Sequence, residues 1–194
     1  MDLWEAERMD LDLVPRLQGS RVIRRPHRDE DIAQRASLGR RRDIVRAMGG
    51  NISSDRSMTQ AAARKQINRR FGPGPHWSVA DPCDQFLGLA RLAPIDAENS
   101  IGTFAIALFD PDKLGQGLGT EATMLAVDYG LTKLGLSRIT PTVLADNQRA
   151  IAAYKKAGFA IERRIKGTLQ RDGDSHDDLV MSTGLDPRST ARRS

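Results

Sequence analysis

The chain has 194 residues, of which 39% are hydrophobic and 28% charged, and its formal net charge is +5. This length and composition predict one globular domain with a hydrophobic core. The single cysteine, Cys83, excludes an internal disulfide, and no Cys/His cluster has the spacing of zinc ligands. The acidic N-terminus lacks the positive charge of a signal peptide, and no apolar run is long enough to span a bilayer. We therefore expect a soluble, cytoplasmic protein.

Charge is distributed unevenly along the chain. The net charges are −4 for residues 1–15, +10 for 16–71, −5 for 72–112 and +4 for 113–194. We expect an N-terminal extension over 1–15, the domain itself over 16–185 and a basic, flexible tail over 186–194. The arginine-rich segment 16–71 is either a solvated helical face or a surface for a phosphate-rich partner.

The first predicted elements are a short strand and two helices. Residues 21–25 form the strand, and Asp29 can cap a helix that starts at Glu30. Thr59 can cap a second helix, which runs as far as Phe71 before glycine and proline residues stop it. Three strands follow, separated by turn residues, and predict an antiparallel meander. They span residues 76–81, 86–92 and 101–109. Cys83 falls in one of these turns, where no neighbouring group activates its thiol.

A glycine-rich loop, Gly115 to Gly119, then opens a helix with apolar residues at helical spacing. After it we expect a strand over 138–144, a helix over 147–157, a strand from Phe159 and a last strand over 178–182. The order β-α-α-β-β-β-α-β-α-β-β predicts an α/β (α+β) fold. Its mixed sheet has about seven strands, with about four helices on its faces.

A glycine-rich loop at a helix start is an anion site, because free backbone N–H groups and the helix dipole converge there. It can also be a purely structural tight turn. The loop lacks the Gly-Lys-Ser/Thr ending of a nucleoside triphosphate site, which excludes a P-loop. Residues 117–122 do satisfy a dinucleotide fingerprint, and Asp146 could mimic its ribose-binding acid, so an NAD(P)-binding oxidoreductase is an alternative. Too few residues follow the loop for a doubly wound sheet, which disfavours this alternative.

Two motifs resemble the GNAT superfamily of N-acetyltransferases. The pyrophosphate loop of that family reads Gln/Arg-x-x-Gly-x-Gly/Ala, and Leu114 to Gly119 matches it except that Leu114 replaces the polar first residue. The helix motif Asn-x-x-Ala-x-x-x-Tyr-x-x-x-Gly-Phe is matched from Asn147 to Phe159 at every fixed position. The resemblance extends over residues 16–184. The turn at 172–178 is similar to the branch that includes ribosomal-protein and polyamine acetyltransferases.

The resemblance implies acetyl-CoA as cosubstrate and no metal. The loop amides would hold the pyrophosphate, and the pantetheine arm would lie between splayed strands that end near residues 109 and 144. A backbone N–H of Leu108 or Phe109 would stabilise the oxyanion. Asn147 would bond the pantetheine, cap its helix, or do both. The cofactor-binding residues implied in this way are Leu108, Phe109, Gly115, Gln116, Gly117, Leu118, Gly119, Thr120, Asn147 and Tyr154.

The resemblance also places Tyr154 where the family has a tyrosine that protonates the departing thiolate, and a phenol donates a proton readily at neutral pH. Tyr154 could instead be a packed core aromatic. The usual strand-four glutamate is missing from residues 103–108, where Phe104 takes its position. Four residues could act as a base through water without one being favoured, and His76 is typical of a strand-end surface histidine. They are Asp81, Glu98, Asp110 and His76.

The acidic stretch from residue 81 to residue 112 suggests a site for a cationic amine, if its turns line the acceptor cleft. Its carboxylates are Asp81, Asp84, Asp96, Glu98, Asp110 and Asp112. Solvated turns are the alternative. We expect an acceptor that is a small cationic amine, an aminoglycoside-like compound or a protein N-terminus, with no membrane partner. Nucleic acid is disfavoured, because the arginine-rich segment lacks interleaved aromatics. A homodimer and a catalytically silent CoA- or nucleic-acid-binding module remain open.

Overall fold

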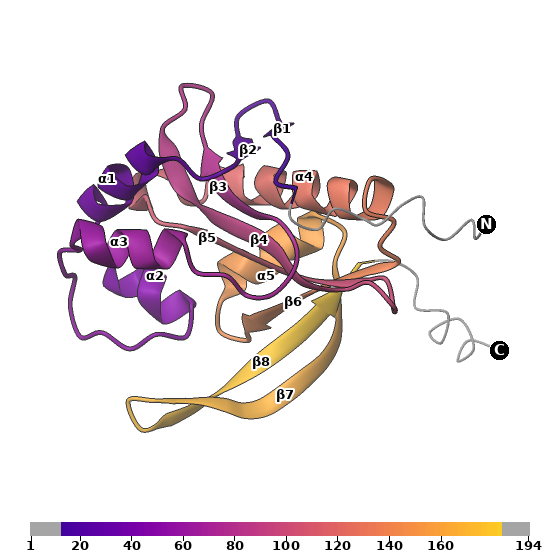
Figure 1. The fold of residues 1–194 in the computed structure, drawn as a ribbon. Helices are drawn as coiled ribbons and strands as arrows, with labels where there is room; N and C mark the ends of the chain where they lie inside the picture. The colour runs from indigo at the N-terminus through magenta and orange to yellow at the C-terminus, as the bar shows by residue number, and fades with distance from the viewer. Residues whose placement is uncertain (1–12, 184–194) are drawn as a thin grey trace, which may run out of the picture.

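Eight strands form one sheet, in the order β1-β2-β3-β4-β5-β6-β8-β7, in the computed structural model, which describes residues 13–183 (Figure 1). The pair β5–β6 is parallel and the other neighbouring pairs are antiparallel. The strands are β1 (Leu17–Gln18), β2 (Ile23–Arg25), β3 (His76–Ala80), β4 (Phe86–Asp96), β5 (Ile101–Leu108), β6 (Arg138–Leu144), β7 (Ala160–Arg171) and β8 (Asp174–Ser182).

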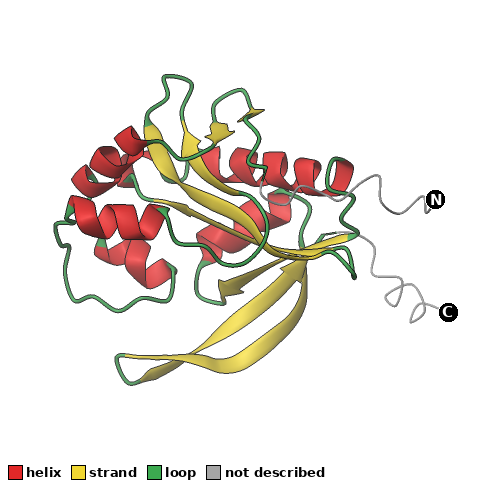
Figure 2. Ribbon diagram, viewed as in Figure 1, coloured by secondary structure: helices red, strands yellow, loops and turns green. Residues whose placement is uncertain are grey.

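Helices cover both faces of the sheet (Figure 2). They are α1 (Asp29–Ser37), α2 (Arg42–Ala47), α3 (Gln60–Ile67), α4 (Leu118–Thr132) and α5 (Gln148–Lys156), with a short 3-10 helix, η1 (Pro111–Lys113). On one face, Leu89 of β4 and Ala107 of β5 pack among residues of the first three helices. On the other face, Trp77, Leu92 and Phe104 pack against α4 and α5 in the largest core cluster.

The predicted mixed sheet with helices on its faces is confirmed, but the described residues contain one strand and one helix more than expected. The additional strand, β1, has two residues and is too short to give a sequence signal. The additional helix, α2, has six residues. A helix of that length has little stability of its own and depends on tertiary contacts, which a sequence pattern does not show.

Two strand boundaries also differ from expectation. β4 continues through Pro94 to Asp96, where a turn was predicted, because Pro94 lies at a register shift of the β4–β5 ladder that needs no N–H from it. The β7–β8 hairpin extends well beyond the core and closes on a turn at Asp172 and Gly173, both with positive φ. Its outer residues are mostly polar and exposed, so hydrophobic alternation does not mark them as strands. The predicted tail, 186–194, lies outside the described residues.

A buried ion pair fixes the start of α1 against the sheet. The carboxylate of Asp31, fully buried, accepts hydrogen bonds from both terminal nitrogens of Arg25 at 2.8 and 2.9 Å. It also accepts the Ser78 hydroxyl at 2.6 Å and the Arg28 N–H at 3.0 Å. Burial alone raises the pKa of Asp31, but these donors outweigh it and hold the pKa below its ordinary value. Asp84 accepts a further bond from Arg25 at 2.5 Å.

Replacing Asp31 with Asn should lower the free energy of unfolding by about 3 kcal/mol, because it leaves a buried guanidinium without its main counter-charge. In the wild type, the contribution of Asp31 is complete above its unfolded pKa of about 3.9 and is lost as the pH falls through the lower folded value. Urea unfolding at pH 7 and at lower pH measures both effects. Asp29→Asn is the matched control on the same helix; its side chain is 88% exposed, and stability should change by less than about 0.5 kcal/mol.

Candidate functional site

The central feature of the site is a gap between two neighbouring strands. β5 and β6 pair in parallel from Ile101 with Arg138 to Phe104 with Pro141, and no later residue of the two strands is paired across this edge. Pro141 has no N–H to donate, so it is poorly suited to continue the ladder. The end of β6 pairs instead with β8, through residues 142–144. Backbone groups of β5 beyond Phe104 are therefore left facing an opening.

The register of β4 and β5 shows which backbone groups of β5 face this gap. The Phe109 N–H donates to the Leu87 carbonyl at 2.9 Å, on the β4 side. Because successive residues of a strand point their N–H groups to opposite sides, those of Ile106 and Leu108 point toward the gap. Of the two N–H groups considered for an oxyanion, that of Phe109 is bonded within the sheet, whereas that of Leu108 lies on the side of the gap. Its contact with an oxyanion stays a prediction.

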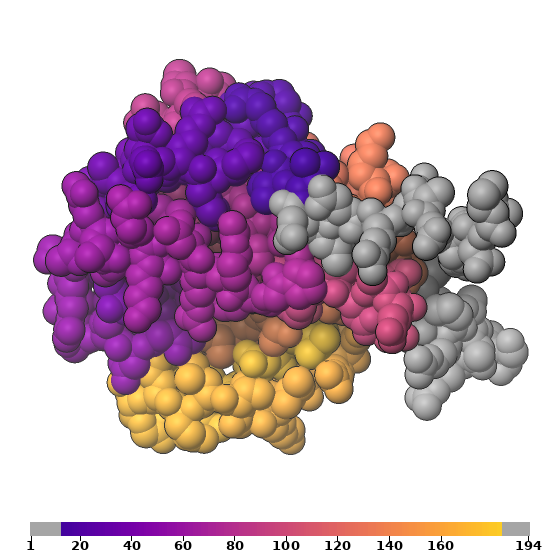
Figure 3. All heavy atoms as spheres, in the orientation of Figure 1, coloured from indigo at the N-terminus to yellow at the C-terminus, as the bar shows by residue number. Residues whose placement is uncertain are grey.

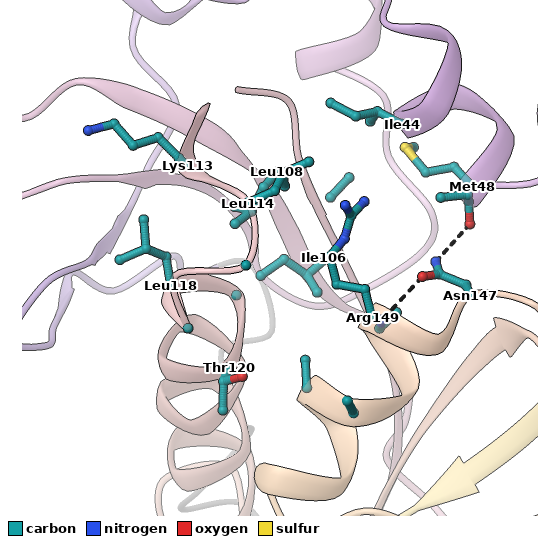
Figure 4. A pocket seen from close by; sticks show the side chains of 18 of the residues that line it. Ile44, Met48, Ile106, Leu108, Lys113, Leu114, Leu118, Thr120, Asn147 and Arg149 are labelled. Atoms are coloured by element: carbon teal, nitrogen blue, oxygen red, sulfur yellow. Dashed lines mark hydrogen bonds between the residues drawn. The ribbon is translucent and has the colours of Figure 1, made fainter. Parts of the chain in front are cut away.

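A cavity of about 270 Å³ lies where the glycine-rich loop meets α2 and α5 (Figure 4). Among the described residues, three cationic side chains and no carboxylate line it; the cations are Lys113, Arg149 and Lys156. Figure 4 shows Arg149 extending from the first turn of α5 into the middle of the cavity. The other labelled residues around it are Ile44, Met48, Ile106, Leu108, Leu114, Leu118, Thr120 and Asn147. The charge of this cavity suits an anion.

The loop geometry leaves backbone N–H groups available. Gly115 and Gly117 have φ of 76° and 82°, in the left-handed region that glycine tolerates best. Gly117 is the N-cap of α4, so the first N–H groups of this 15-residue helix have no partner within the helix. A Cβ on Gly115 would meet nothing within 4 Å, and one on Gly117 would lie 3.2 Å from Nη2 of Arg21.

The structure brings together most of the predicted loop residues, with one exception. Gly115, Gly117, Leu118, Gly119 and Thr120 all line the cavity. Gln116 does not line it: its carbonyl accepts a hydrogen bond from Arg21 at 2.8 Å, and its side-chain amide donates to the Asp112 carbonyl at 2.7 Å. The Gln116 side chain therefore stabilises the loop by a hydrogen bond outside the cavity.

The side chain of Asn147 links α5 to the end of α2. Its Oδ1 accepts the Ala150 N–H at 3.1 Å, which caps α5, and its Nδ2 donates to the Ala47 carbonyl at 2.9 Å, which holds the end of α2 (Figure 4). Of the two roles considered for Asn147, the helix cap is the one the structure contains. Its contact with pantetheine stays a prediction.

A second, larger cavity of about 600 Å³ adjoins the first. The two share wall residues from α2, β5 and α5: Ala47, Met48, Ile106, Ala107, Asn147 and Ala150. The second cavity extends between the β7–β8 hairpin and the segments above it, where the surface in Figure 3 is recessed. A long ligand can therefore lie in the first cavity and present one end in the second.

Tyr154 lines the second cavity, and its ring is 4% exposed. The ring packs edge-on against Phe104 and Phe159, with centroids 6.1 and 5.6 Å away. Burial raises the pKa of Tyr154 to about 12, and the charge of nearby Arg91 opposes this only in part. The phenol therefore stays protonated at neutral pH and can donate a proton.

The six carboxylates of the acidic stretch do not line the larger cavity, so the condition under which they would form a site for a cationic amine is not met there. Several of them bond locally. Asp81 accepts the Cys83 and Gln85 N–H groups, Asp96 accepts the side chain and backbone N–H of Asn99, and Asp110 caps η1. Short polar side chains in turns commonly bond to nearby backbone in this way.

His76 lines the cavity, but it is not the surface residue that was expected, because it is 5% exposed. Its Nε2 accepts the Phe71 N–H at 3.2 Å, so its Nδ1 must carry the proton that bonds the Gly74 carbonyl at 2.9 Å. Burial lowers the pKa of His76. Both nitrogens of this neutral ring are occupied, which leaves none to accept a proton from substrate.

Sequence reasoning missed three charged residues of the larger cavity: Arg69, Arg91 and Asp178. Asp178 is the one carboxylate in that wall among the described residues. Strand alternation could have identified it, because Leu179 and Met181 belong to the core and Asp178 must face the opposite side. The two arginines come from segments that only the tertiary fold brings together.

Among residues 13–183, no group of three or more His, Cys, Asp or Glu side chains is placed to hold a metal ion. In the same part of the chain, no helix combines the length and apolarity needed to cross a membrane.

The chain is similar to known acetyltransferases in sequence and in fold. The chain is 38% identical to the spermidine N(1)-acetyltransferase of Escherichia coli K12 over 84 residues, which are 43% of this chain and 45% of that protein. A crystal structure of a GNAT-family acetyltransferase from Bacillus anthracis superposes with a TM-score of 0.72 at 16% identity, covering 87% of this chain and 97% of that one. For a Vibrio cholerae spermidine N-acetyltransferase in complex with CoA and spermine, the TM-score is 0.68 at 21% identity, covering 84% and 95%.

The chain thus spans about half the length of the curated relative it matches, and the solved structures share its fold. The acetyltransferase (GNAT) domain family matches residues 21–160, which include the loop, the strand gap and Tyr154. The chain therefore belongs to the GNAT acetyltransferase domain family.

Proposed function

We propose that the protein transfers an acetyl group from acetyl-CoA to a primary amine. One observation carries the proposal: a cationic cavity at a helix N-terminus continues past a strand gap into a second cavity that contains a buried phenol. Family membership supports the same reaction.

The residues of the first cavity fit the donor. N–H groups at the start of α4, from Leu118 to Thr120, suit a pyrophosphate, and the helix dipole favours negative charge there. The guanidinium of Arg149 adds a side-chain charge that reaches into the cavity. Apolar Leu114, at the first motif position, supplies no polar contact, so recognition depends mainly on the main chain.

In the second cavity, acetyl-CoA supplies an acetyl group activated as a thioester. The reaction joins the acceptor nitrogen to the acetyl carbon, breaks the bond from that carbon to sulfur, and transfers one proton from nitrogen to the thiol. The Leu108 N–H, which points into the gap, is placed to stabilise developing negative charge on the carbonyl oxygen. Protonated Tyr154 donates to the leaving sulfur.

The acceptor is a primary amine on a small molecule or at a protein N-terminus. Similarity to a spermidine N(1)-acetyltransferase supports amine chemistry in general. Asp178, on the cavity wall, is the described carboxylate best placed to accept the proton that the amine loses. Direct transfer within a ternary complex follows, because the two cavities share a wall and both reactants can be bound together.

Two alternatives are less consistent with the structure. In a doubly wound dinucleotide-binding sheet, the strand that leads into the loop has parallel neighbours on both sides. Here that strand, β5, is parallel to β6 but antiparallel to β4. A catalytically silent CoA-binding module would not need the buried phenol beside the gap. Isothermal titration with CoA and with NAD⁺, followed by thiol release from acetyl-CoA across a panel of amines, separates the three. Binding of NAD⁺ alone, or of CoA without any turnover, would contradict the proposal.

Replacing Gly117 with Ala should raise the Kd for CoA by roughly tenfold, because forcing a side chain into left-handed backbone costs about 1–2 kcal/mol and shifts the loop amides. Gly135→Ala is the matched control. Gly135 also has positive φ, at 62°, but its added Cβ meets nothing within 4 Å and it lines neither cavity. Calorimetry on both variants is the measurement, and equal weakening of CoA binding in the two would rule out the loop as the binding element.

Replacing Tyr154 with Phe should lower kcat by roughly 100-fold or more, with the KM for acetyl-CoA changed by less than about twofold, because only a proton donor is lost. Since the pKa of Tyr154 is about 12, ionisation of this phenol should not lower wild-type kcat between pH 7 and about pH 10. Steady-state thiol release over this range tests both statements. Tyr129→Phe, in the same core cluster but outside both cavities, should retain wild-type kcat.

A further inference from the structure

Two arginines and one phenylalanine form a cluster on the wall of the larger cavity. The guanidinium carbons of Arg91 and Arg69 lie 4.0 and 4.6 Å from the ring centroid of Phe71. All three residues line the cavity, and they come from β4 and from the segment that follows α3. A single aromatic ring thus holds two cations at the same site.

No carboxylate of residues 13–183 lies within ion-pair distance of either arginine. The Arg91 guanidinium donates to the Ala93 carbonyl, which leaves other donors of its fork available. Burial lowers the pKa of Arg91, Tyr154 opposes this in part, and the charge of Arg69 acts in the same direction as burial, so the two guanidinium groups repel each other. Such a pair is stabilised by an anion bound between or beside the two groups.

The neighbouring histidines do not change this charge balance. His76 is neutral with both nitrogens occupied, and burial lowers the pKa of His27 to about 4, so it too is uncharged at neutral pH. Asp178 is the one carboxylate in the described wall, against the two guanidinium groups. Excess positive charge is unsuited to a polyamine, which carries several ammonium groups and no anion.

The cluster lies close to the point of transfer. Arg91 pairs across β4 and β5 with Ala105, the first residue beyond the last parallel pair at Phe104. Neighbouring strands are about 4.8 Å apart, so the backbone of Arg91 is one strand spacing from the edge of the gap. Tyr154 packs on Phe104 and is near enough to Arg91 for the guanidinium charge to lower the pKa of the phenol in part. An anion bound at this cluster would therefore lie in the same cavity as an amine placed at the gap.

Building on the proposed acetyltransferase function, we propose that the acceptor is a small amino acid-like molecule whose carboxylate binds Arg91 and Arg69 while its amine faces the gap beside Tyr154. The planar fork of arginine matches a carboxylate in two parallel hydrogen bonds, which gives orientation as well as affinity. The exposed edge of Phe71 and nearby apolar walls would contact the remainder of the molecule. The cavity volume of about 600 Å³ accommodates such an acceptor.

The test uses acceptor pairs that differ only in the carboxylate. Thiol release from acetyl-CoA is measured with phenylalanine against phenethylamine, leucine against 3-methylbutylamine, and the other common amino acids, with spermidine and O-phosphoethanolamine as further arms. At least one amino acid should have a kcat/KM about tenfold or more above that of its decarboxylated partner and of spermidine. Preference for O-phosphoethanolamine over every amino acid would assign the cluster to phosphate and overturn the carboxylate proposal.

Variants then assign the preference to the cluster. Arg91→Gln and Arg69→Gln should each lower kcat/KM for the preferred amino acid by about tenfold or more while leaving the decarboxylated amine and the Kd for CoA within about twofold. Arg91→Lys, which keeps the charge but not the fork, should fall between wild type and Arg91→Gln. Arg163→Gln makes the same change of charge at an exposed position of β7 outside both cavities and should have no effect.

The outcomes separate this inference from the function on which it rests. Better turnover of spermidine or of the decarboxylated amines than of any amino acid would refute the carboxylate proposal and leave the acetyltransferase intact. CoA binding with no turnover of any amino acid would also refute it. Equal losses for both members of an acceptor pair in Arg91→Gln would show that the arginine has only a structural role. Failure to bind CoA at all would instead refute the proposed function itself.

Discussion

The early end of the parallel pairing between β5 and β6 is the constraint on which the site depends. Had the ladder continued beyond Phe104 and Pro141, the N–H groups of Ile106 and Leu108 would be bonded within the sheet, and the two cavities would have no common opening. Leaving these backbone groups unpaired costs free energy, which a ligand with its own amides would recover by bonding to them in the gap. A local break in the strand pairing is thus the binding site that the proposed function requires, and the intact ladders on both sides keep it open.

In the proposed function, the two cavities recognise their ligands by different means. The donor side uses main-chain N–H groups at a helix start, with cationic side chains around them and an apolar residue at the first motif position. The acceptor side uses side chains brought from distant segments, such as Arg91 in β4 and Asp178 in β8. Main-chain recognition tolerates sequence change as long as the turn is kept, whereas side-chain recognition changes with a single substitution.

Local motifs were the part of the site that the sequence predicted well. The span from Asn147 to Phe159 placed α5, its cap and Tyr154, and the glycines placed the start of α4, because each signal lies within a few residues. Features that require distant segments to meet were not predictable. The pairing of Arg69 and Arg91 on Phe71 and the six-residue α2 depend on tertiary packing. The acidic stretch misled for a related reason: Asp81 and Asp96 bond neighbouring backbone groups and Asp84 pairs with Arg25, which composition does not reveal.

The attachment of α2 has a consequence for the order in which the protein is made. This short helix closes one side of the donor cavity, and residues late in the chain hold it: Asn147 bonds the Ala47 carbonyl, Arg171 bonds the Arg46 carbonyl, and Asp172 pairs with the Arg46 side chain. Because a six-residue helix has little stability of its own, its attachment is complete only when the hairpin has left the ribosome. A nascent chain that stops short of residue 171 would already carry the glycine loop yet lack these contacts to α2, so the wall of this cavity is complete only after the β7–β8 hairpin has been synthesised.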